Sequence, residues 1–331
     1  MSWNIFNFHK LSNNYIMKNI YSNIYPFSKK VLKKTTKILK EGDLVSLPTE
    51  TVYGLAGNAY SKKAINKIYK LKKRPKNNPL IIHYLNIKNA TKDVIINDNF
   101  LKLYKKLCPG PVTFVLKKKS KSKLNMLATA QLNTVAIRFP NHKIIRSVLK
   151  HINFPLAMPS ANLSSRLSPI NALDVFDEFH EKLKIIINGG NSKIGIESTV
   201  VDLTEKPRIL RPGIISSSEI KKIIKIISLK KKTKLISPGM LSKHYSPGIP
   251  VYINKKPKNL KDAYLVFGKK FKNKNNYFNL SKKGDLKEAA SNLYRTMRKV
   301  KKKGFKRIFV SKIPNIGIGV AINDRLKRAS N

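Results

Sequence analysis

The sequence predicts an α/β protein with a mixed sheet, followed by a smaller domain of the same class. Up to about residue 183, short apolar runs typical of strands alternate with segments whose apolar residues recur at helical spacing. Between residues 184 and 213, three strand candidates follow one another with only turns between them, which argues against a purely parallel sheet. After Pro250, strand and helix patterns alternate again, and this predicts the second domain.

Residues that begin or end regular structure bound these elements. Gly42 and Pro75 end two helices, because glycine favours a helix C-terminus and a residue before proline avoids the helical region. Ser61 is an N-cap candidate, and Ser216 with Glu219 has the spacing of a capping box. The expected helices cover 28–42, 61–74, 97–110, 141–152, 172–183, 216–227, 286–303 and 319–329. The expected strands cover 43–49, 79–85, 111–117, 133–140, 154–162, 184–189, 198–204, 207–213, 251–253, 263–268 and 307–310.

Composition limits the classes of protein to be considered. The chain has 331 residues, 41% of them apolar, which is enough to bury the cores of one large and one small domain. The single cysteine, Cys108, excludes an intrachain disulfide and is compatible with a reducing compartment, so we expect a cytoplasmic protein. No uncharged apolar run reaches the length of a membrane helix, and no membrane partner or protein-held metal is expected.

The charge of the chain has two explanations. With 68 basic and 17 acidic residues the formal charge is +51, which suits a polyanion such as RNA. However, 57 of the basic residues are lysines and only 11 are arginines, and Asn and Ile are abundant too. This bias is typical of an A+T-rich coding sequence, which would spread lysine over every solvated face. We favour the second explanation, so only weak RNA binding is expected.

Residues 46–84, "SLPTETVYGLAGNAYSKKAINKIYKLKKRPKNNPLIIHY", combine hydroxyls, glycines and positive charge. Gly54 and Gly57 are expected to let the backbone approach a ligand closely. Each feature also has a purely structural explanation. Threonines in a tight loop bond their own backbone, and cations at a helix end favour its dipole. The histidine inside the following apolar strand would then be a core residue.

Two arginines favour a binding site instead. Arg138 and Arg211 lie in or at the end of apolar strands, where an unpaired guanidinium is too costly to keep, so each is expected to meet an anion. Ser160 and Ser198 stand at strand ends as well. The residues alone therefore predict a site for an anionic, phosphate-bearing small molecule, made from several strand-end loops.

Seven segments resemble, in order, the signature blocks of the L-threonylcarbamoyladenylate synthases, the YrdC-like family. They are "SLPTETVYGLAGNA", "LKKRPKNNPLIIH", "PGPVTFVLK", "TVAIRFP", "PLAMPSANLS", "ESTVVDLT" and "ILRPG". Two later segments, "SPGMLSKHYSP" and "GIGVAINDRLKRAS", are similar to the linker and C-terminal domain of the longer form of the family. The linker departs from the family pattern at Leu241 and Ser242.

The resemblance implies an organisation. Residues 1–27 have no counterpart and are expected to form an N-terminal extension, either ordered or disordered. Residues 28–215 would be the catalytic domain, an open twisted mixed sheet with helices and a concave basic pocket. Residues 216–249 would form a linker that closes over the pocket as a lid, with Pro238, Gly239, His244 and Tyr245 nearest the nucleotide. Residues 250–331 would form a small Rossmann-like domain.

The family's reaction is also implied. L-threonine, bicarbonate or CO2, and ATP give threonylcarbamoyl-AMP and pyrophosphate, so the family is of the nucleotidyltransferase type. The product feeds the t6A modification at position 37 of tRNA, through a downstream tRNA threonylcarbamoyl transferase that receives it directly or by diffusion. Mg2+ would accompany ATP, held by phosphates and water.

The resemblance also assigns roles to single residues. Lys72 and Arg74 would be catalytic and would bind the ATP phosphates. The remaining contacts to ATP or the adenylate would come from Asn78, Thr134, Asn162, Arg211 and Tyr245. The threonine would be held by Thr51, His83, Arg138, Ser160 and Ser198.

Two other functions are considered. A non-catalytic RNA-binding module would suit the charge, but it needs exposed cations, whereas Arg138 and Arg211 lie in apolar strands. A related carbamoyl-phosphate-dependent hydrogenase-maturation protein needs zinc-finger cysteines, which a chain with one cysteine cannot supply.

Overall fold

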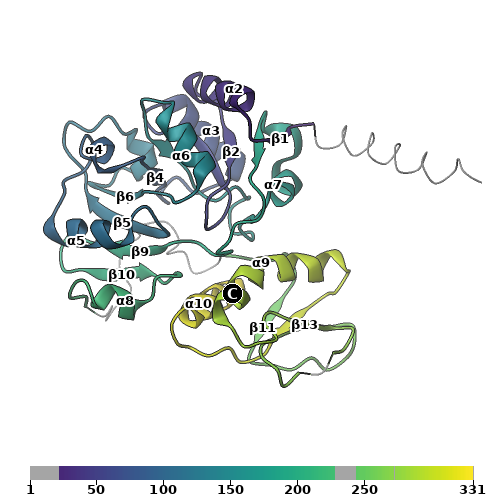
Figure 1. Ribbon diagram of the computed structural model, residues 1–331. Coiled ribbons are helices and arrows are strands. Elements are labelled where there is room, and N and C mark those ends of the chain that lie inside the picture. Colours follow the sequence, from purple (N-terminus) through teal and green to yellow (C-terminus); the bar gives the residue numbers. More distant parts are fainter. Residues whose placement is uncertain (1–21, 228–243, 272, 331) are drawn as a thin grey trace, which may run out of the picture.

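The computed structural model describes residues 22–227, 244–271 and 273–330, which form two α/β units (Figure 1). The larger unit has a mixed sheet with the strand order β1-β8-β2-β3-β7-β4-β6-β5-β9-β10. Its strands are β1 (Ile24–Pro26), β2 (Val45–Leu47), β3 (Gly54–Asn58), β4 (Ile81–His83), β5 (Val112–Lys117), β6 (Thr134–Arg138), β7 (Leu156–Ala157), β8 (Ile186–Asn188), β9 (Thr199–Asp202) and β10 (Arg208–Arg211). Both parallel and antiparallel pairs occur, so the predicted mixed sheet is confirmed.

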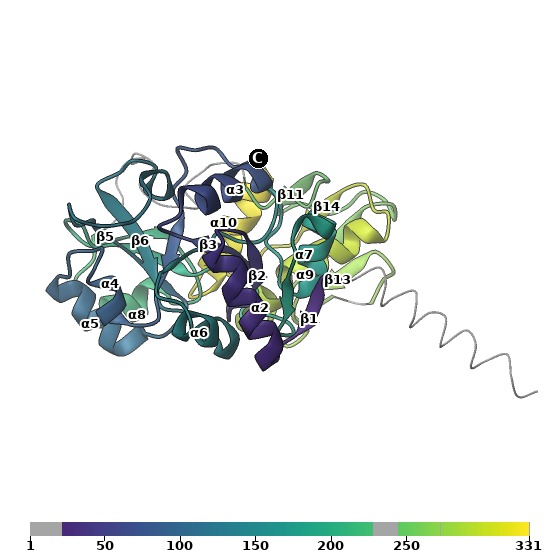
Figure 2. The ribbon, with the colours of Figure 1, turned by 90° about the horizontal axis from the view of Figure 1, so that it is seen from above.

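Helices cover this sheet, and α2 and α3 lie near β2 and β3 (Figure 2). They are α2 (Lys29–Lys40), α3 (Lys62–Lys72), α4 (Ile87–Ala90), α5 (Asp98–Leu107), α6 (Lys143–Lys150), α7 (Ala172–Phe179) and α8 (Ser217–Lys221), with 3-10 turns η1 (Met126–Thr129) and η2 (His180–Lys182). The predicted caps are confirmed. The Ser61 side chain accepts from the backbone N–H of Ala64, and Ser216 and Glu219 form a capping box.

The smaller unit is a four-stranded parallel sheet with two helices. Its order is β11-β14-β12-β13, from β11 (Val251–Ile253), β12 (Ala263–Val266), β13 (Tyr277–Asn279) and β14 (Ile308–Val310). The helices are α9 (Leu286–Lys302) and α10 (Gly319–Ala329), and they lie between this sheet and the larger unit (Figure 1). The predicted Rossmann-like α/β character is consistent with this arrangement.

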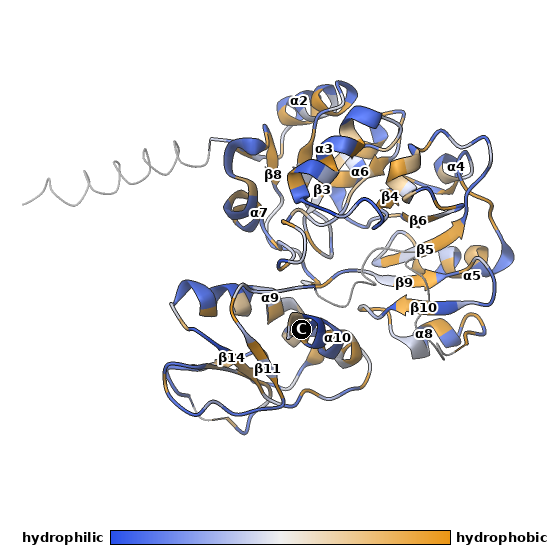
Figure 3. Ribbon diagram, turned by 180° about the vertical axis from the view of Figure 1, so that it is seen from behind, coloured by the Kyte–Doolittle hydropathy of each residue, from blue (hydrophilic) through white to orange (hydrophobic). Residues whose placement is uncertain are grey.

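One apolar cluster is shared by the two units. Ile196 of the larger unit and Leu293, Ala321 and Ile322 of the smaller unit belong to the same buried cluster. The larger unit has further buried clusters of its own, which its own helices and strands supply. Strands such as β5 and β9 are largely hydrophobic in Figure 3, whereas the helices carry hydrophilic residues on part of their surface. The shared cluster fixes the smaller unit against the side of the larger one.

The structure shifts two of the expected boundaries. The sheet begins at Ile24, inside the expected extension 1–27, because β1 pairs in parallel with β8 and Asn23 donates to the carbonyls of His180 and Leu183. At the other end, Ile220 and Ile224 pack in a core of the larger unit, so this unit extends beyond residue 215. The helix there is shorter than expected. Leu241, Ser242, Pro238 and Gly239 of the expected lid lie outside the described residues.

The glycines of the 46–84 stretch serve the core more than a ligand. They lie in strand β3, which the sequence analysis assigned to a loop. A side chain on Gly57 would come within 2.8 Å of Leu44 and 3.2 Å of Ala64, and one on Gly54 would overlap Met158. At both glycines the backbone therefore lies close to neighbouring core residues and not only to a ligand site. Gly54 also lines the pocket described below. Among the described residues, no helix is long and apolar enough to cross a membrane.

Candidate active site

A pocket opens in the larger unit where several strands end. Seven of the twelve predicted site residues line it: Arg74, His83, Arg138, Ser160, Ser198, Arg211 and Tyr245. The other lining residues are Thr49, Val52, Tyr53, Gly54, Ile81, Met158, Pro159, Glu197 and His244. Parallel pairing of β4 with β6 places His83 beside Arg138, which brings two segments far apart in the sequence into one site.

The loop after α3 holds Arg74. Lys73 ends the helix in the left-handed conformation (φ 50°), and the chain then turns back. The Arg74 guanidinium donates to the Asn78 carbonyl (3.0 Å), to its side-chain oxygen (2.5 Å) and to the Pro79 carbonyl (2.7 Å). In this structure the predicted ATP residue Asn78 thus orients Arg74, and it does not line the pocket itself.

Lys72 is buried beside the pocket, outside its lining. Its ammonium donates to the backbone carbonyls of Ser160 (2.6 Å) and Asn162 (2.5 Å). Burial lowers the pKa of this lysine well below its ordinary value, and the nearby Arg74 lowers it further. Lys72 therefore anchors the loop that presents Ser160 to the pocket.

Arg211 and Ser198 form one wall. Arg211 donates through Nε (3.1 Å) and Nη2 (3.0 Å) to the carbonyl of Ser198, and Nη2 also lies 3.2 Å from the Ser198 hydroxyl. That hydroxyl shares a 2.7 Å hydrogen bond with Thr113. The anion expected for Arg211 is thus replaced, within the described residues, by a backbone carbonyl.

Arg138 meets the anion that the sequence analysis expected. Its Nη2 lies 2.7 Å from Oε1 of Glu50, and both side chains are buried. Glu50 belongs to the Thr-Glu-Thr triplet but was not among the predicted site residues. Buried polar atoms without a partner among the described residues remain in or beside this pocket: Glu50 Oε2, Arg138 Nε, His244 Nδ1 and the Tyr245 hydroxyl.

Three other predicted residues lie outside the lining. The Thr51 hydroxyl bonds to that of Thr49 (2.9 Å), whose own oxygen serves the backbone of the turn. The Asn162 amide donates to the carbonyls of Leu163 and Arg166. Thr134 begins β6, and its hydroxyl is buried without a partner among the described residues. The Thr51 hydroxyl therefore bonds within its own loop, as the structural explanation of the threonines predicts.

Three cations in or beside the pocket, Lys72, Arg74 and Arg211, have no carboxylate partner among the described residues. Among the described residues, no carboxylate lies within ion-pair distance (4.0 Å) of Lys72, Arg74 or Arg211. Burial lowers the pKa of Arg74 to about 10, and Arg211 lowers it further. Burial also lowers the pKa of His244 to about 3, although Glu197 opposes this. The pocket therefore favours an anionic ligand, which would relieve the repulsion among these groups.

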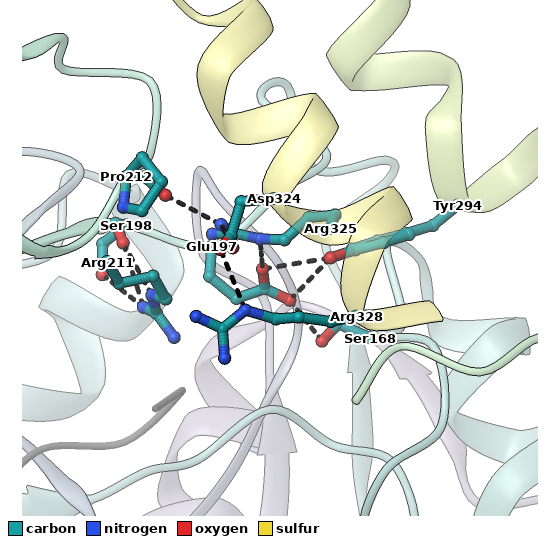
Figure 4. A network of polar contacts seen from close by, with 9 residues as sticks. All are labelled: Ser168, Glu197, Ser198, Arg211, Pro212, Tyr294, Asp324, Arg325 and Arg328. Carbon is teal, nitrogen blue, oxygen red and sulfur yellow. Dashed lines mark hydrogen bonds and ion pairs between the residues drawn. The ribbon is translucent and has the colours of Figure 1, made fainter. Parts of the chain in front are cut away.

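The sequence analysis missed Glu197 and its partners (Figure 4). This buried carboxylate on the pocket wall accepts from the hydroxyls of Ser168 (2.5 Å) and Tyr294 (3.1 and 3.2 Å), and from Nε of Arg325 (2.9 Å). Burial would raise the pKa of Glu197, but Arg325 and Arg211 lower it to about 2. A glutamate inside the apolar run "IGIESTVV" was the available signal.

Acid is expected to destabilise the fold through His244. Its folded pKa, about 3, is below its ordinary value of 6.5, so the unfolded chain binds the proton first. The free energy of unfolding should therefore fall as the pH drops from 6.5 towards 3, by about 1.6 kcal/mol between pH 6.5 and 5 for this group. Urea unfolding of His244→Gln and of a control, His151→Gln at an exposed site, measures this share. An equal pH slope in the wild type and His244→Gln would contradict the prediction.

The comparisons with known proteins agree with one another. A family model described as "Telomere recombination" matches residues 37–213, and one described as "Threonylcarbamoyl-AMP synthase, C-terminal domain" matches residues 215–331. The threonylcarbamoyl-AMP synthase of Pyrococcus abyssi is 35% identical over 88% of this chain and 92% of its own length. That of Bacillus subtilis is 33% identical over 90% of this chain and 92% of its own length.

A solved structure extends this likeness to three dimensions. The crystal structure of P. abyssi Sua5 complexed with L-threonine superposes with a TM-score of 0.85 at 33% identity. The match covers 93% of this chain and 97% of that one, so it includes both units. The chain therefore belongs to the threonylcarbamoyl-AMP synthase family.

Proposed function

We propose that this protein is a threonylcarbamoyl-AMP synthase, a nucleotidyltransferase that makes threonylcarbamoyl-AMP and pyrophosphate from L-threonine, bicarbonate or CO2, and ATP. One observation carries the proposal beyond the family relation. Arg74 and Arg211 line one pocket, with Lys72 beside it, and none has a carboxylate partner among the described residues. Such a site suits a phosphate-bearing substrate.

The chemistry places few demands on the protein. The amine of threonine adds to the carbon of CO2 and loses a proton to water, which gives a carbamate, and a carbamate oxygen then attacks the α-phosphorus of ATP. The bond from this phosphorus to the bridging oxygen breaks, and pyrophosphate leaves with the electron pair. A site that positions two ligands and stabilises phosphate charge is sufficient, and no nucleophilic side chain is needed.

We assign the two ligands to two different sets of residues in the pocket. Arg74 and Arg211 would face the phosphates, and the ring of Tyr245 would lie beside the nucleotide. The threonine would be held by His83, Arg138, Ser160 and Ser198, all of which line the pocket. The paired state of Arg138 with Glu50 supports a fixed orientation for its guanidinium.

The other assigned residues act more indirectly in this proposal. Lys72 and Asn162 would support the Ser160 loop, and Asn78 would aim Arg74. To contact a phosphate, the Lys72 ammonium would have to give up its hydrogen bonds to the two carbonyls or divide its donors between them and the phosphate. For Thr51 and Thr134 the contacts to threonine and ATP remain proposals without further support from the geometry.

Mg2+ is expected to enter with ATP. The described residues contain no group of three or more His, Cys, Asp or Glu side chains that could hold a metal ion, and Glu197 is already bonded to Arg325. These residues do not fit a resident metal site. Oxygen atoms of the triphosphate and water are the expected ligands of the ion.

The product would be consumed by a tRNA threonylcarbamoyl transferase that installs t6A at position 37, and we expect both steps in the cytoplasm. We expect residues 216–249 to act as a lid; of this segment His244 and Tyr245 line the pocket, and residues 228–243 lie outside the described part of the chain. RNA would bind weakly and non-specifically through the lysine excess, with an affinity that falls as salt rises.

Release of pyrophosphate tests the proposed function. We expect it to require threonine, bicarbonate and ATP together, to proceed without tRNA, and to yield threonylcarbamoyl-AMP that mass spectrometry detects. Release that depends on added tRNA would favour the RNA-binding alternative. No release under any of these conditions would refute the synthase.

Ser198→Ala is expected to raise the KM for threonine by roughly fivefold, since it removes one hydrogen bond worth about 1 kcal/mol. The kcat and the KM for ATP should change little. Saturation curves for both substrates measure this, with Ser218→Ala at an exposed site as the control. If ATP binding weakens instead, the assignment of Ser198 to threonine is wrong.

A further inference from the structure

Arg325 connects the smaller unit to the pocket of the larger one. It belongs to α10, and only 1% of it is exposed. Its Nε donates to Glu197 (2.9 Å), its Nη1 donates to the carbonyl of Pro212 (2.8 Å), and its guanidinium lies 5.3 Å from the ring centre of Tyr245. No residue of the smaller unit was among the predicted site residues.

Each of these contacts adjoins a group assigned to a substrate. Glu197 directly precedes Ser198, and Pro212 directly follows Arg211. Tyr245 lines the pocket itself, and its ring also stacks on Tyr294 of α9 at 5.8 Å. One side chain thus fixes both chain segments of the Ser198–Arg211 wall and the aromatic ring beside them.

The charge of Arg325 has a second consequence. Glu197 and Arg211 line the same pocket and influence each other's charge, yet Glu197 pairs with Arg325 and not with Arg211 (Figure 4). The pKa of Glu197, lowered to about 2, keeps this carboxylate ionised at neutral pH. A free Glu197 would be the nearest available anion for Arg211, and it would compete with a phosphate.

We propose that Arg325 is a positioning residue for the nucleotide side of the site: it holds Glu197 away from Arg211, so that Arg211 stays available for the phosphates of ATP. The inference rests on the proposed function, because it takes ATP to be the ligand of Arg211. It assigns the smaller unit a role in substrate binding, which it exerts without touching the substrate.

The test compares ATP and threonine saturation, together with ATP binding by calorimetry, for the full-length chain and its variants. Arg325→Met removes the charge at similar size and should raise the KM and Kd for ATP by at least about 30-fold, with less than about a fivefold change for threonine. Arg325→Lys should lie between, because one ammonium cannot reproduce the fork that serves both Glu197 and Pro212. Arg307→Met is the matched control.

Arg307 suits this purpose because it forms a two-pronged ion pair with Asp262 inside the smaller unit and does not line the pocket. Its variant should keep both KM values within about twofold of the wild type. The double variant Glu197→Gln/Arg325→Met provides the decisive comparison. With the carboxylate neutralised, nothing competes for Arg211, so ATP binding should recover at least about tenfold relative to Arg325→Met.

If Arg325→Met does not fold, Tyr294→Phe gives the answer. It removes a hydroxyl donor to Glu197 and keeps the ring that stacks on Tyr245, and a roughly threefold rise in the Kd for ATP is expected. Equal ATP affinity in the wild type, Arg325→Lys and Tyr294→Phe would overturn the inference. So would a double variant no better than Arg325→Met, or an equal loss for both substrates. Failure of the wild type to release pyrophosphate would instead refute the synthase, while calorimetry still decides the role of Arg325.

Discussion

Arg74→Ala is expected to lower kcat/KM for pyrophosphate release by about 100-fold or more. Arg74 lines the pocket and has no carboxylate partner among the described residues, so its charge is available to the phosphates of ATP. Negative charge shifts to the leaving pyrophosphate during the reaction, and a fixed guanidinium stabilises that change. Three hydrogen bonds from the 74–79 loop hold it in place. Initial rates at varied ATP measure the loss.

Two further variants separate charge from structure. Arg74→Lys should recover only part of the rate, because a single ammonium cannot replace a planar fork of donors. Lys76→Ala, an exposed cation of the same loop, should stay close to the wild type. Thermal melts accompany both. Full activity in Arg74→Ala would show that the reaction does not need this guanidinium, and an unfolded Arg74→Ala protein would show that Arg74 is a structural residue.

Gly213→Ala is expected to destabilise the protein by about 2–3 kcal/mol and to reduce kcat/KM by at least tenfold. A Cβ at this position would lie 2.7 Å from the carbonyl carbon of Ser198 and would overlap the backbone N–H of Thr199. Backbone atoms cannot swing aside as the end of a side chain can. The end of β10, which carries Arg211, would therefore be pushed away from the start of β9, which carries Ser198.

Gly284→Ala is the matched control for this substitution. No heavy atom lies within 4 Å of a Cβ at Gly284, so only its positive φ of 78° opposes the change, at about 1 kcal/mol. Chemical unfolding and substrate saturation distinguish the two variants. If Gly213→Ala keeps its stability and both KM values, the close contact between the two strand ends is not needed for the pocket.

The sequence predicted the elements that have a strong local pattern. Helices with apolar spacing and caps, such as α3 with Ser61, fall within a few residues of the expected ranges. Strands β1 ("IYP") and β13 ("YFN") were missed because each is only three residues long, and β3 ("GLAGN") was missed because glycine and asparagine have a weak strand preference. Their neighbours in the sheet, such as β8 for β1, determine that they are extended.

The site was predictable to the extent that its chemistry is visible in single residues. Arginines inside apolar strands must find a partner, and this indicated Arg138 and Arg211, which line the pocket. The ion pair of Glu197 with Arg325 was not predicted, because the two residues are 128 positions apart and only the docking of the smaller unit brings them together. Thr51 shows the reverse case, since its hydroxyl looked functional in the sequence and bonds to its neighbour in the fold.

The ion pair between Glu197 and Arg325 can form only late in the synthesis of the chain. Synthesis runs from the N-terminus, so the residues of the pocket wall leave the ribosome well before α10 does. Arg325 is synthesised 128 residues after Glu197, so the ion pair cannot form until then. During that interval the nascent larger unit carries the Glu197 carboxylate on the same pocket wall as Arg211, without the ion pair to Arg325. A chain interrupted before α10 would thus leave Glu197 free to compete for Arg211, and we expect it not to consume ATP.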